Sequence, residues 1–164
     1  MFEYLMQPIT ESDANEIIGL FNYYIENSNG TFPDKPVPVS FFSYISQLIH
    51  TYPTVSVRDK SGFFIGFGML RPLSAFPAFN ITTVISYFIH PDYTNKGIGK
   101  EMLKYLENEA KSKGISSILA EISSLNPGSI KFHEKNGFSH CGRFKKVGLK
   151  NGNFFDTIWM QKEI

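Results

Sequence analysis

Apolar residues recur along the chain at spacings that predict alternating strands and helices. Short runs rich in β-branched and aromatic residues, bounded by Gly, Pro, Asn or Asp, indicate strands, whereas apolar residues three or four positions apart indicate amphipathic helices. The predicted strands are residues 2–8, 54–58, 63–70, 81–89, 115–122, 138–147 and 154–162. The predicted helices are residues 10–27, 40–49, 97–113 and 126–135.

Local signals support several of these boundaries. Thr10, followed three residues later by Asp13, is typical of a helix N-cap with an acidic first turn, and Ser40 is placed to cap the second helix. Gly114 is placed to end the third helix. Residues 81–89 are nearly all apolar, as in a strand buried on both faces. The order β-α-α-β-β-β-α-β-α-β-β predicts an α/β (α+β) fold with a mixed sheet of about seven strands and about four helices.

Composition is typical of an ordinary globular protein. Of the 164 residues, 42% are hydrophobic and 19% are charged, which excludes general disorder. Because no internal repeat or linker divides the chain, residues 1–164 are predicted to form a single domain. The formal net charge of +1 gives no field that would attract DNA or an anionic membrane. We therefore expect no nucleic-acid partner and no membrane partner.

Cysteine content and the first residues bear on the compartment. The single cysteine, Cys141, excludes an intrachain disulfide, and we interpret it as a buried strand residue. The chain does not start with a cationic stretch followed by an apolar one, and it has no apolar run of 18 residues. His50, His90 and His140 lack metal-ligand spacing. These features predict a cytoplasmic protein without a metal.

The most informative segment is the turn between the fourth predicted strand and the third predicted helix. Gly97 and Gly99 stand there, where backbone amides and the helix dipole can bind an anion such as a pyrophosphate. Lys96 and Lys100 would add positive charge. A dinucleotide fingerprint would need a third glycine where Met102 stands, and a Walker A loop also fails. The alternative is a tight connection whose glycines serve only the turn.

Motifs along nearly the whole chain occur in the order found in one family. The segment His90-Pro91-Asp92-Tyr93-x-x-Lys96-Gly97-Ile98-Gly99 resembles the acetyl-CoA pyrophosphate motif of GNAT-superfamily N-acetyltransferases. Further motifs resemble the phosphinothricin acetyltransferase branch: Asn126, Ser129 and Ile130 before His133-Glu134-Lys135-Asn136-Gly137-Phe138; Val147-Gly148-x-Lys150-x-Gly152 with Asp156 and Gln161; and, upstream, Thr31-Phe32 and Arg71-Pro72-x-Ser74-Ala75.

This resemblance implies the GNAT fold and a defined reaction. It implies transfer of the acetyl group of acetyl-CoA to the amine of a small molecule, an amino acid or an analogue, by a cytoplasmic homodimer that uses no metal. Two alternatives stay open. One is a catalytically silent protein that binds acyl-CoA or regulates; the other is an enzyme that acetylates a protein N-terminus or a lysine.

The resemblance also implies which residues contact acetyl-CoA. Backbone groups of Phe88 and Ile89 are expected to pair with the pantetheine arm, and Asn126 either hydrogen-bonds that arm or caps the last helix. The complete set expected at the cofactor is Tyr87, Phe88, Ile89, Asn95, Lys96, Gly97, Ile98, Gly99, Lys100, Asn126, Ser129 and Lys135.

At the reacting centre the chain departs from the branch. The glutamate expected seven residues before Pro91 is Val84, although Ser86 is retained, and the arginine expected shortly before it is Asn80. We hypothesise that Glu121 is the replacement base; the alternative is a structural strand residue. His133 could protonate the leaving thiolate or could pack beside the cofactor. The predicted catalytic residues are therefore Glu121, His133 and Ser86, and the predicted substrate-binding residues are Phe32, Arg71, Asn80 and Val84.

Other aromatic and basic residues receive simpler interpretations. Phe32, Phe76 and Phe79 lie in loops that contain proline and are expected to form the wall of the acceptor pocket. A larger aromatic group is expected in the core: Phe41, Phe42, Tyr44, Phe63, Phe64 and Phe67. The lysines at 145, 146 and 150 are expected on a solvated strand face, where one of them could meet the 3′-phosphate of CoA.

Overall fold

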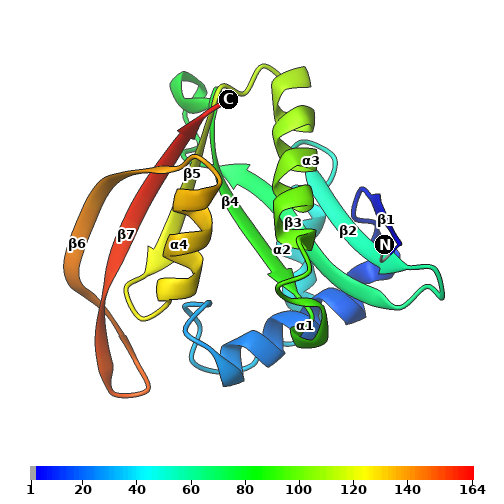
Figure 1. Cartoon of the computed structure of the whole chain (residues 1–164), viewed down its shortest axis with the longest axis horizontal. Coiled ribbons are helices and arrows are strands. Elements are labelled where there is room, and N and C mark those ends of the chain that lie inside the picture. Colours follow the sequence, from blue (N-terminus) through cyan, green and yellow to red (C-terminus); the bar gives the residue numbers. More distant parts are fainter. Residues whose placement is uncertain (1–2) are drawn as a thin grey trace.

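The computed structural model describes residues 3–164 and is organised around one mixed β-sheet (Figure 1). Phe2, where the first predicted strand begins, lies outside the described residues. Seven strands of the described chain have the order β1-β2-β3-β4-β5-β7-β6. They are β1 (Tyr4–Gln7), β2 (Thr54–Asp59), β3 (Phe64–Pro72), β4 (Thr82–Ile89), β5 (Ser117–Ser123), β6 (Ser139–Lys150) and β7 (Asn153–Glu163). Only β4 and β5 pair in parallel within this region, which confirms the predicted mixed sheet.

The helices found in residues 3–164 match the four predicted ones in position. They are α1 (Ala14–Asn27), α2 (Phe42–Ser46), α3 (Ile98–Ser112) and α4 (Pro127–Lys135), and short 3-10 turns precede α1 and α2 at Glu11–Asp13 and Val39–Phe41. The prediction that Ser40 caps the second helix is wrong, because Ser40 lies inside the 3-10 turn and α2 begins after it. No helix in this part of the chain is long and apolar enough to cross a membrane.

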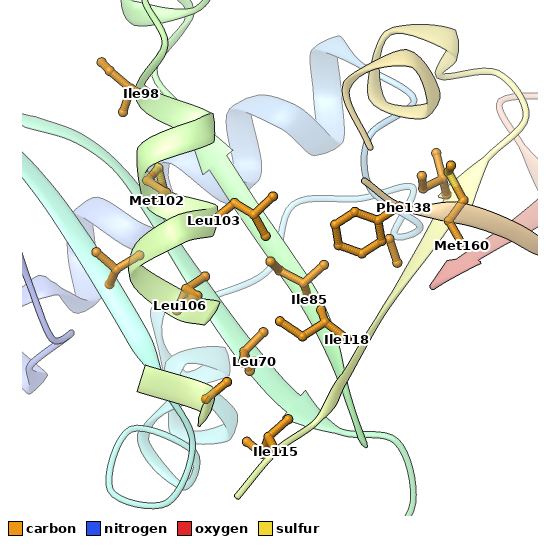
Figure 2. Packing of buried hydrophobic residues seen from close by; sticks show 14 of the residues in the cluster. Leu70, Ile85, Ile98, Met102, Leu103, Leu106, Ile115, Ile118, Phe138 and Met160 are labelled. Carbon is orange, nitrogen blue, oxygen red and sulfur yellow. The ribbon is translucent and has the colours of Figure 1, made fainter. Parts of the chain in front are cut away.

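Each face of the sheet carries its own apolar cluster. On one face, the inward stripe of α3, which includes Met102 and Leu106, packs with Ile118 of β5 and Met160 of β7 (Figure 2). On the other face, α1 and α2 pack against Phe67 and its neighbours on β3. Because both faces are covered, the middle of the sheet is shielded from water, and a gap between two central strands would form an internal cleft.

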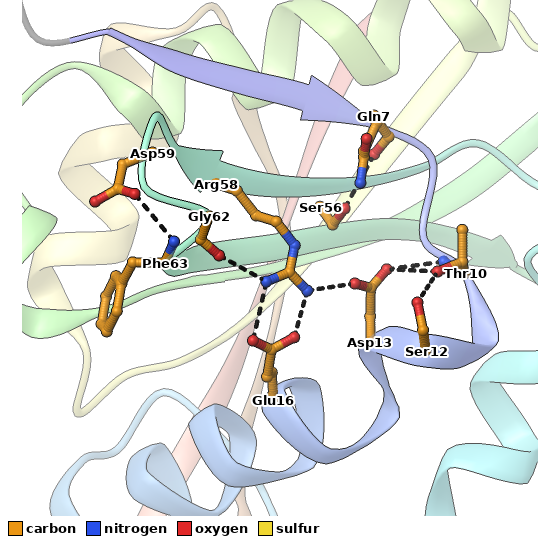
Figure 3. A network of polar contacts seen from close by, with 10 residues as sticks. All are labelled: Gln7, Thr10, Ser12, Asp13, Glu16, Ser56, Arg58, Asp59, Gly62 and Phe63. Atoms are coloured by element: carbon orange, nitrogen blue, oxygen red, sulfur yellow. Dashed lines mark hydrogen bonds and ion pairs between the residues drawn. The ribbon is translucent and has the colours of Figure 1, made fainter.

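Arg58 fixes the start of α1 to the hairpin formed by β2 and β3 (Figure 3). Its guanidinium donates to Asp13 at 2.7 Å, to Glu16 at 2.9 Å and to the carbonyl of Gly62 at 3.0 Å. Asp13 is 1% exposed and also accepts the amide of Thr10 at 2.9 Å. The two carboxylates raise the pKa of Arg58, so this cation stays charged at every relevant pH. The contact fixes the N-terminal end of α1.

Two expectations about burial are wrong in part. Three of the six aromatic residues predicted for the core are more than a third exposed: Phe41, Tyr44 and Phe63. Cys141 was expected to be buried but is exposed. Its strand, β6, lies at the edge of the sheet and is exposed along most of its length, so strand-like apolar patterning did not imply burial there.

The close approach of β3 and β4 provides a test of the fold. A Cβ on Gly66 would lie 2.4 Å from the backbone carbonyl oxygen of Phe88, an overlap that only a backbone shift can relieve. We predict that Gly66→Ala lowers the free energy of unfolding by about 1–3 kcal/mol. Gly19, inside α1, has open space at the same position, so Gly19→Ala should stabilise by about 0.5–1 kcal/mol. Chemical denaturation measures the free energy of unfolding of both variants. An equal change in the two would contradict this spacing of β3 and β4.

Candidate active site

The parallel strands β4 and β5 separate along their length and open a cleft in the sheet. Residues 82–84 of β4 pair with residues 117–119 of β5, and no further pairs follow in the described chain. Beyond this point β4 continues to pair with β3, and β5 continues to pair with β7. Figure 1 shows the two strands side by side at the top and apart below. The separation leaves one edge of β4 without a strand partner.

The hydrogen-bond alternation of β4 determines which backbone groups face this cleft. The amide of His90 donates to the carbonyl of Ile65 at 2.6 Å. Because antiparallel ladders alternate, Phe88 also directs its amide and carbonyl toward β3. Tyr87 and Ile89 direct theirs toward the open side. The expectation that the Phe88 backbone pairs with a pantetheine arm therefore does not fit the register, whereas Ile89 does fit.

The cleft is part of a cavity of about 440 Å³ that involves α1, α3 and α4. Tyr24 of α1 lines it and donates its hydroxyl to the Ile89 carbonyl at 2.6 Å. With that carbonyl occupied, the amide of Ile89 is the group this residue directs into the cleft. The turn before α3 and the first residues of α4 close the cavity on the other side.

The turn before α3 has the backbone conformation of an anion site. Asn95 and Gly97 have φ values of 59° and 83°, in the left-handed region that glycine and asparagine adopt most easily. The first hydrogen bond of α3 runs from the Lys100 amide to the Gly97 carbonyl at 3.1 Å. The amides of Ile98 and Gly99 precede it, so they are the donors that a helix N-terminus offers to a ligand.

The side chains around this turn divide between the cavity and the rest of the fold. Lys100 lines the cavity, and so do Asn95 and Gly99. The ammonium of Lys96 instead lies 4.7 Å from the centre of the Tyr93 ring. The Ile98 side chain is buried in the core, so only its backbone can serve a ligand.

Asn126 begins α4 and lines the cavity at the same time. Its side-chain oxygen accepts the amide of Ser129 at 3.2 Å, and Pro127 occupies the first helical position. The predicted N-cap is confirmed. Ser129 also lines the cavity, whereas Lys135 stands at the far end of α4 and does not.

His133 is buried and hydrogen-bonded through both ring nitrogens. Nδ1 lies 2.7 Å from the carbonyl oxygen of Ser129, and Nε2 lies 2.7 Å from the hydroxyl of Tyr87. A carbonyl only accepts, so Nδ1 carries the proton and the neutral ring accepts the Tyr87 proton at Nε2. Burial lowers the pKa of His133 and raises the pKa of Tyr87 well above its ordinary range. The geometry therefore favours packing beside the cleft over proton donation.

A second cavity, of about 220 Å³, adjoins the first. Ser86 and Glu121 line both cavities, together with Gly30, Ile85 and Phe88. Phe32, Val84 and Arg71 line only the second, on the face of the sheet that α1 and α2 cover. These residues come from the loop after α1 and from three neighbouring strands, so the fold brings together most of the predicted substrate and catalytic residues.

The two charged side chains of the second cavity face each other. Arg71 Nη2 lies 3.4 Å from Glu121 Oε2, and the side chains are 30% and 24% exposed. At that separation the contact is a weak ion pair that an incoming ligand can replace. Other predicted positions lie outside both cavities: Asn80, Phe76 and Phe79, all in or beside the exposed 3-10 turn Pro77–Phe79. Within residues 3–164, no group of three or more His, Cys, Asp or Glu side chains is arranged to hold a metal ion.

Lys150 holds the loop that borders the second cavity. It was predicted on a solvated strand face, but it is 3% exposed. Its Nζ donates to the carbonyls of Ser28 and Thr31, each at 3.0 Å. Burial lowers the pKa of this ammonium, and Asp34 opposes that effect. Hydrophobic patterning does not separate this buried lysine from its exposed neighbours on β6, although its place in the motif Val147-Gly148-x-Lys150-x-Gly152 sets it apart.

Comparison with known proteins agrees with this geometry. Residues 11–138 match the family described as acetyltransferase (GNAT) family. The L-methionine sulfoximine/L-methionine sulfone acetyltransferase of Salmonella typhimurium is 27% identical over 156 residues, which cover 94% of this chain and 91% of that protein. The L-amino acid N-acyltransferase MnaT of Escherichia coli is 27% identical over 158 residues, covering 94% and 90%.

A solved structure shows the same fold. A GNAT superfamily phosphinothricin acetyltransferase from Sinorhizobium meliloti, in complex with AcCoA, aligns with a TM-score of 0.92 at 25% identity, over 98% of this chain and 88% of that chain. The match to the family covers most of the chain, and the central sheet opens between β4 and β5 beside the turn that precedes α3. The chain belongs to the acetyltransferase (GNAT) family.

Proposed function

We propose that this protein transfers the acetyl group of acetyl-CoA to the amine of a small molecule, an amino acid or an analogue. The observation that carries the proposal is the junction of two cavities at Ser86 and Glu121. One cavity offers backbone donors and an anion-binding turn, and the other offers a carboxylate and a guanidinium. The relatives named as amino acid acyltransferases, and the neighbour described with AcCoA, support this reading.

Acetyl-CoA fits the first cavity from its pyrophosphate to its thioester. The amides of Ile98 and Gly99, with the charge of Lys100, suit the pyrophosphate. The pantetheine arm would lie along the open edge of β4, where Tyr87 and Ile89 direct their backbone groups. The thioester then reaches the junction, and the amide of Tyr87, which follows Ser86 and faces the open side of β4, would polarise its carbonyl.

Glu121 is the group that we assign to deprotonate the acceptor. The carboxylate takes one proton from the ammonium, the nitrogen attacks the thioester carbon and the C–N bond forms. The nitrogen then loses its second surplus proton to solvent as the C–S bond breaks. The departing thiolate takes a proton from solvent, since an ordinary thiol has a pKa of about 8.5. An α-amine has a pKa of about 7.8, so its deprotonation at pH 7 costs only about 1 kcal/mol. A single carboxylate, that of Glu121, is therefore sufficient to deprotonate an α-amine.

The acceptor is a small molecule rather than a protein. The second cavity measures about 220 Å³ and is bordered by the loop that Lys150 holds and by α2. A protein N-terminus or lysine would need an open groove. In this cavity Arg71 is positioned to bind a carboxylate of the acceptor, and Ser86 can hydrogen-bond to it.

The working form that we propose is a homodimer of single-domain chains in the cytoplasm. The β6–β7 hairpin exposes more than half of several apolar side chains: Phe144, Val147, Leu149 and Phe154. Phe144, Val147 and Leu149 line a hollow that Phe32 and Glu121 also line, so a second copy seated there would border the acceptor site. The exposed free thiol of Cys141 suits a reducing compartment.

The reaction is tested by incubating the protein with acetyl-CoA and a panel of small amines while free thiol is measured. We expect free CoA to form when the amine is an amino acid. Glu121→Gln should lower kcat at pH 7 by about fivefold or more, with CoA binding unchanged, because the amide keeps the shape but accepts no proton, and only the neutral fraction of the amine then reacts. Glu134→Gln, which alters a half-exposed carboxylate on α4 that pairs with His140, is the control and should keep full activity. CoA binding without turnover on any amine would favour the silent binder.

The anion site is tested with two glycines that share a left-handed conformation at opposite ends of α3. Gly97 and Gly114 have φ values of 83° and 76°, with open space at both Cβ positions. Each change to alanine should therefore cost about 1 kcal/mol of stability. Only Gly97→Ala should weaken CoA binding, by roughly tenfold or more, because only that turn faces the pyrophosphate. Calorimetric titration with CoA measures the affinity of each variant. Equal affinities would contradict the assignment of the pyrophosphate to the turn at Gly97.

The dimer is tested by sedimentation of variants with one added charge. We expect the wild-type protein to sediment with the mass of two chains, and Leu149→Lys to sediment as a monomer, because the new charge would be buried in the interface. Leu5→Lys is the control: Leu5 is 60% exposed on β1, at the opposite edge of the sheet. A monomeric wild-type protein would refute the proposed dimer.

A further inference from the structure

The acceptor cavity is polar at one end and apolar elsewhere. Arg71, Glu121 and Ser86 gather where it meets the acetyl-CoA cleft. The remaining wall is formed mainly by rings and a thioether: Phe21, Phe32, Phe41, Tyr44, Phe67 and Met69. The hydroxyl of Thr31, which also lines this wall, is already hydrogen-bonded to Lys150 at 3.2 Å. A ligand that fills this space would therefore meet mostly carbon.

The rings hold one another in place. Phe21 stacks on Phe41 with centroids 6.0 Å apart, and it meets Phe88 edge-on at 5.4 Å. Phe32 stacks on Phe155 of β7 at 5.8 Å. A preformed aromatic wall needs little rearrangement to receive a ligand. Phe32 and Phe41 are nevertheless 44% and 39% exposed, so apolar surface remains for an occupant to cover.

The charges of the cavity match only the two charges that every α-amino acid carries. Arg71 and Glu121 are the charged residues that line it, and they have opposite signs. A carboxylate on Arg71 and an ammonium near Glu121 would use both. Val84, 1% exposed, stands where a further carboxylate is expected from the resemblance. Beyond Arg71 and Glu121, the described residues that line this cavity carry no charged side chain and no side-chain amide.

We propose that the acceptor is an α-amino acid with a large apolar side chain, either aromatic, branched aliphatic or thioether. The side chain lies among the rings of Phe21, Phe32 and Phe41, while the ammonium stays at the junction with the acetyl-CoA cleft. This inference rests on the proposed function and narrows its substrate class. Selectivity follows because a polar side chain would lose its hydration against a wall that is mostly carbon, where the hydroxyl of Tyr44 offers it few hydrogen bonds in return.

The test compares pairs of acceptors that have similar shapes and whose side chains differ in polarity. With acetyl-CoA in excess, kcat/KM is measured for leucine against asparagine, phenylalanine against histidine, and methionine against methionine sulfone. We expect the apolar member of each pair to be favoured by roughly tenfold or more. Equal or reversed values, with CoA still released, would overturn this inference alone. If none of the amines causes the protein to release CoA, the proposed function is wrong, and this inference fails with it.

A variant locates the selectivity in the aromatic wall. Phe41→Ala should lower kcat/KM for phenylalanine and leucine by roughly tenfold, and for alanine by less than about twofold, because a methyl group does not reach the ring. Tyr23→Ala is the matched control: Tyr23 is 43% exposed and lines a different hollow with Phe63 and His90. An equal loss for alanine and phenylalanine in Phe41→Ala would contradict the placement of the side chain.

Discussion

The structure depends on a parallel pair of strands that stays paired for only three residues at its start. β4 and β5 are hydrogen-bonded at residues 82–84 and 117–119, and each then continues with its other neighbour. A buried strand edge carries backbone donors and acceptors that need partners. In this fold a ligand can supply them, because the separation lies between covered faces of the sheet. The binding cleft is thus a consequence of strand pairing and not of side-chain shape.

Side chains then give the two sides of the cleft different chemistry. Strand alternation places Tyr87 on the α3 and α4 side, with His133, and places Ser86 on the side of α1 and α2, with Arg71 and Glu121. Around Tyr87 and His133 the first side is buried and neutral, since burial lowers the pKa of His133, and its cation, Lys100, lies at the start of α3. The other side holds the opposite charges of Arg71 and Glu121. This arrangement brings a thioester held along β4 to a carboxylate that can accept the acceptor's proton.

The sequence predicted what is encoded locally. The left-handed residues before α3 and the cap at Asn126 follow from residue type and spacing, and both lie at the cleft. Contacts between segments that lie far apart in the sequence could not be predicted from it. The burial of Lys150 depends on a loop more than a hundred residues away, and Phe41 looked like core because helical periodicity cannot distinguish a packed face from the wall of a cavity. The direction of the Phe88 backbone needed the β3–β4 register.

A crystal structure with a non-hydrolysable acetyl-CoA analogue would show whether the gap between β4 and β5 holds the cofactor. We expect the pyrophosphate on the amides of Ile98 and Gly99, the pantetheine arm between β4 and β5, and the thioester carbon within reach of Glu121. Density for the analogue elsewhere on the protein, or an arm that lies outside the gap between the two strands, would contradict this placement.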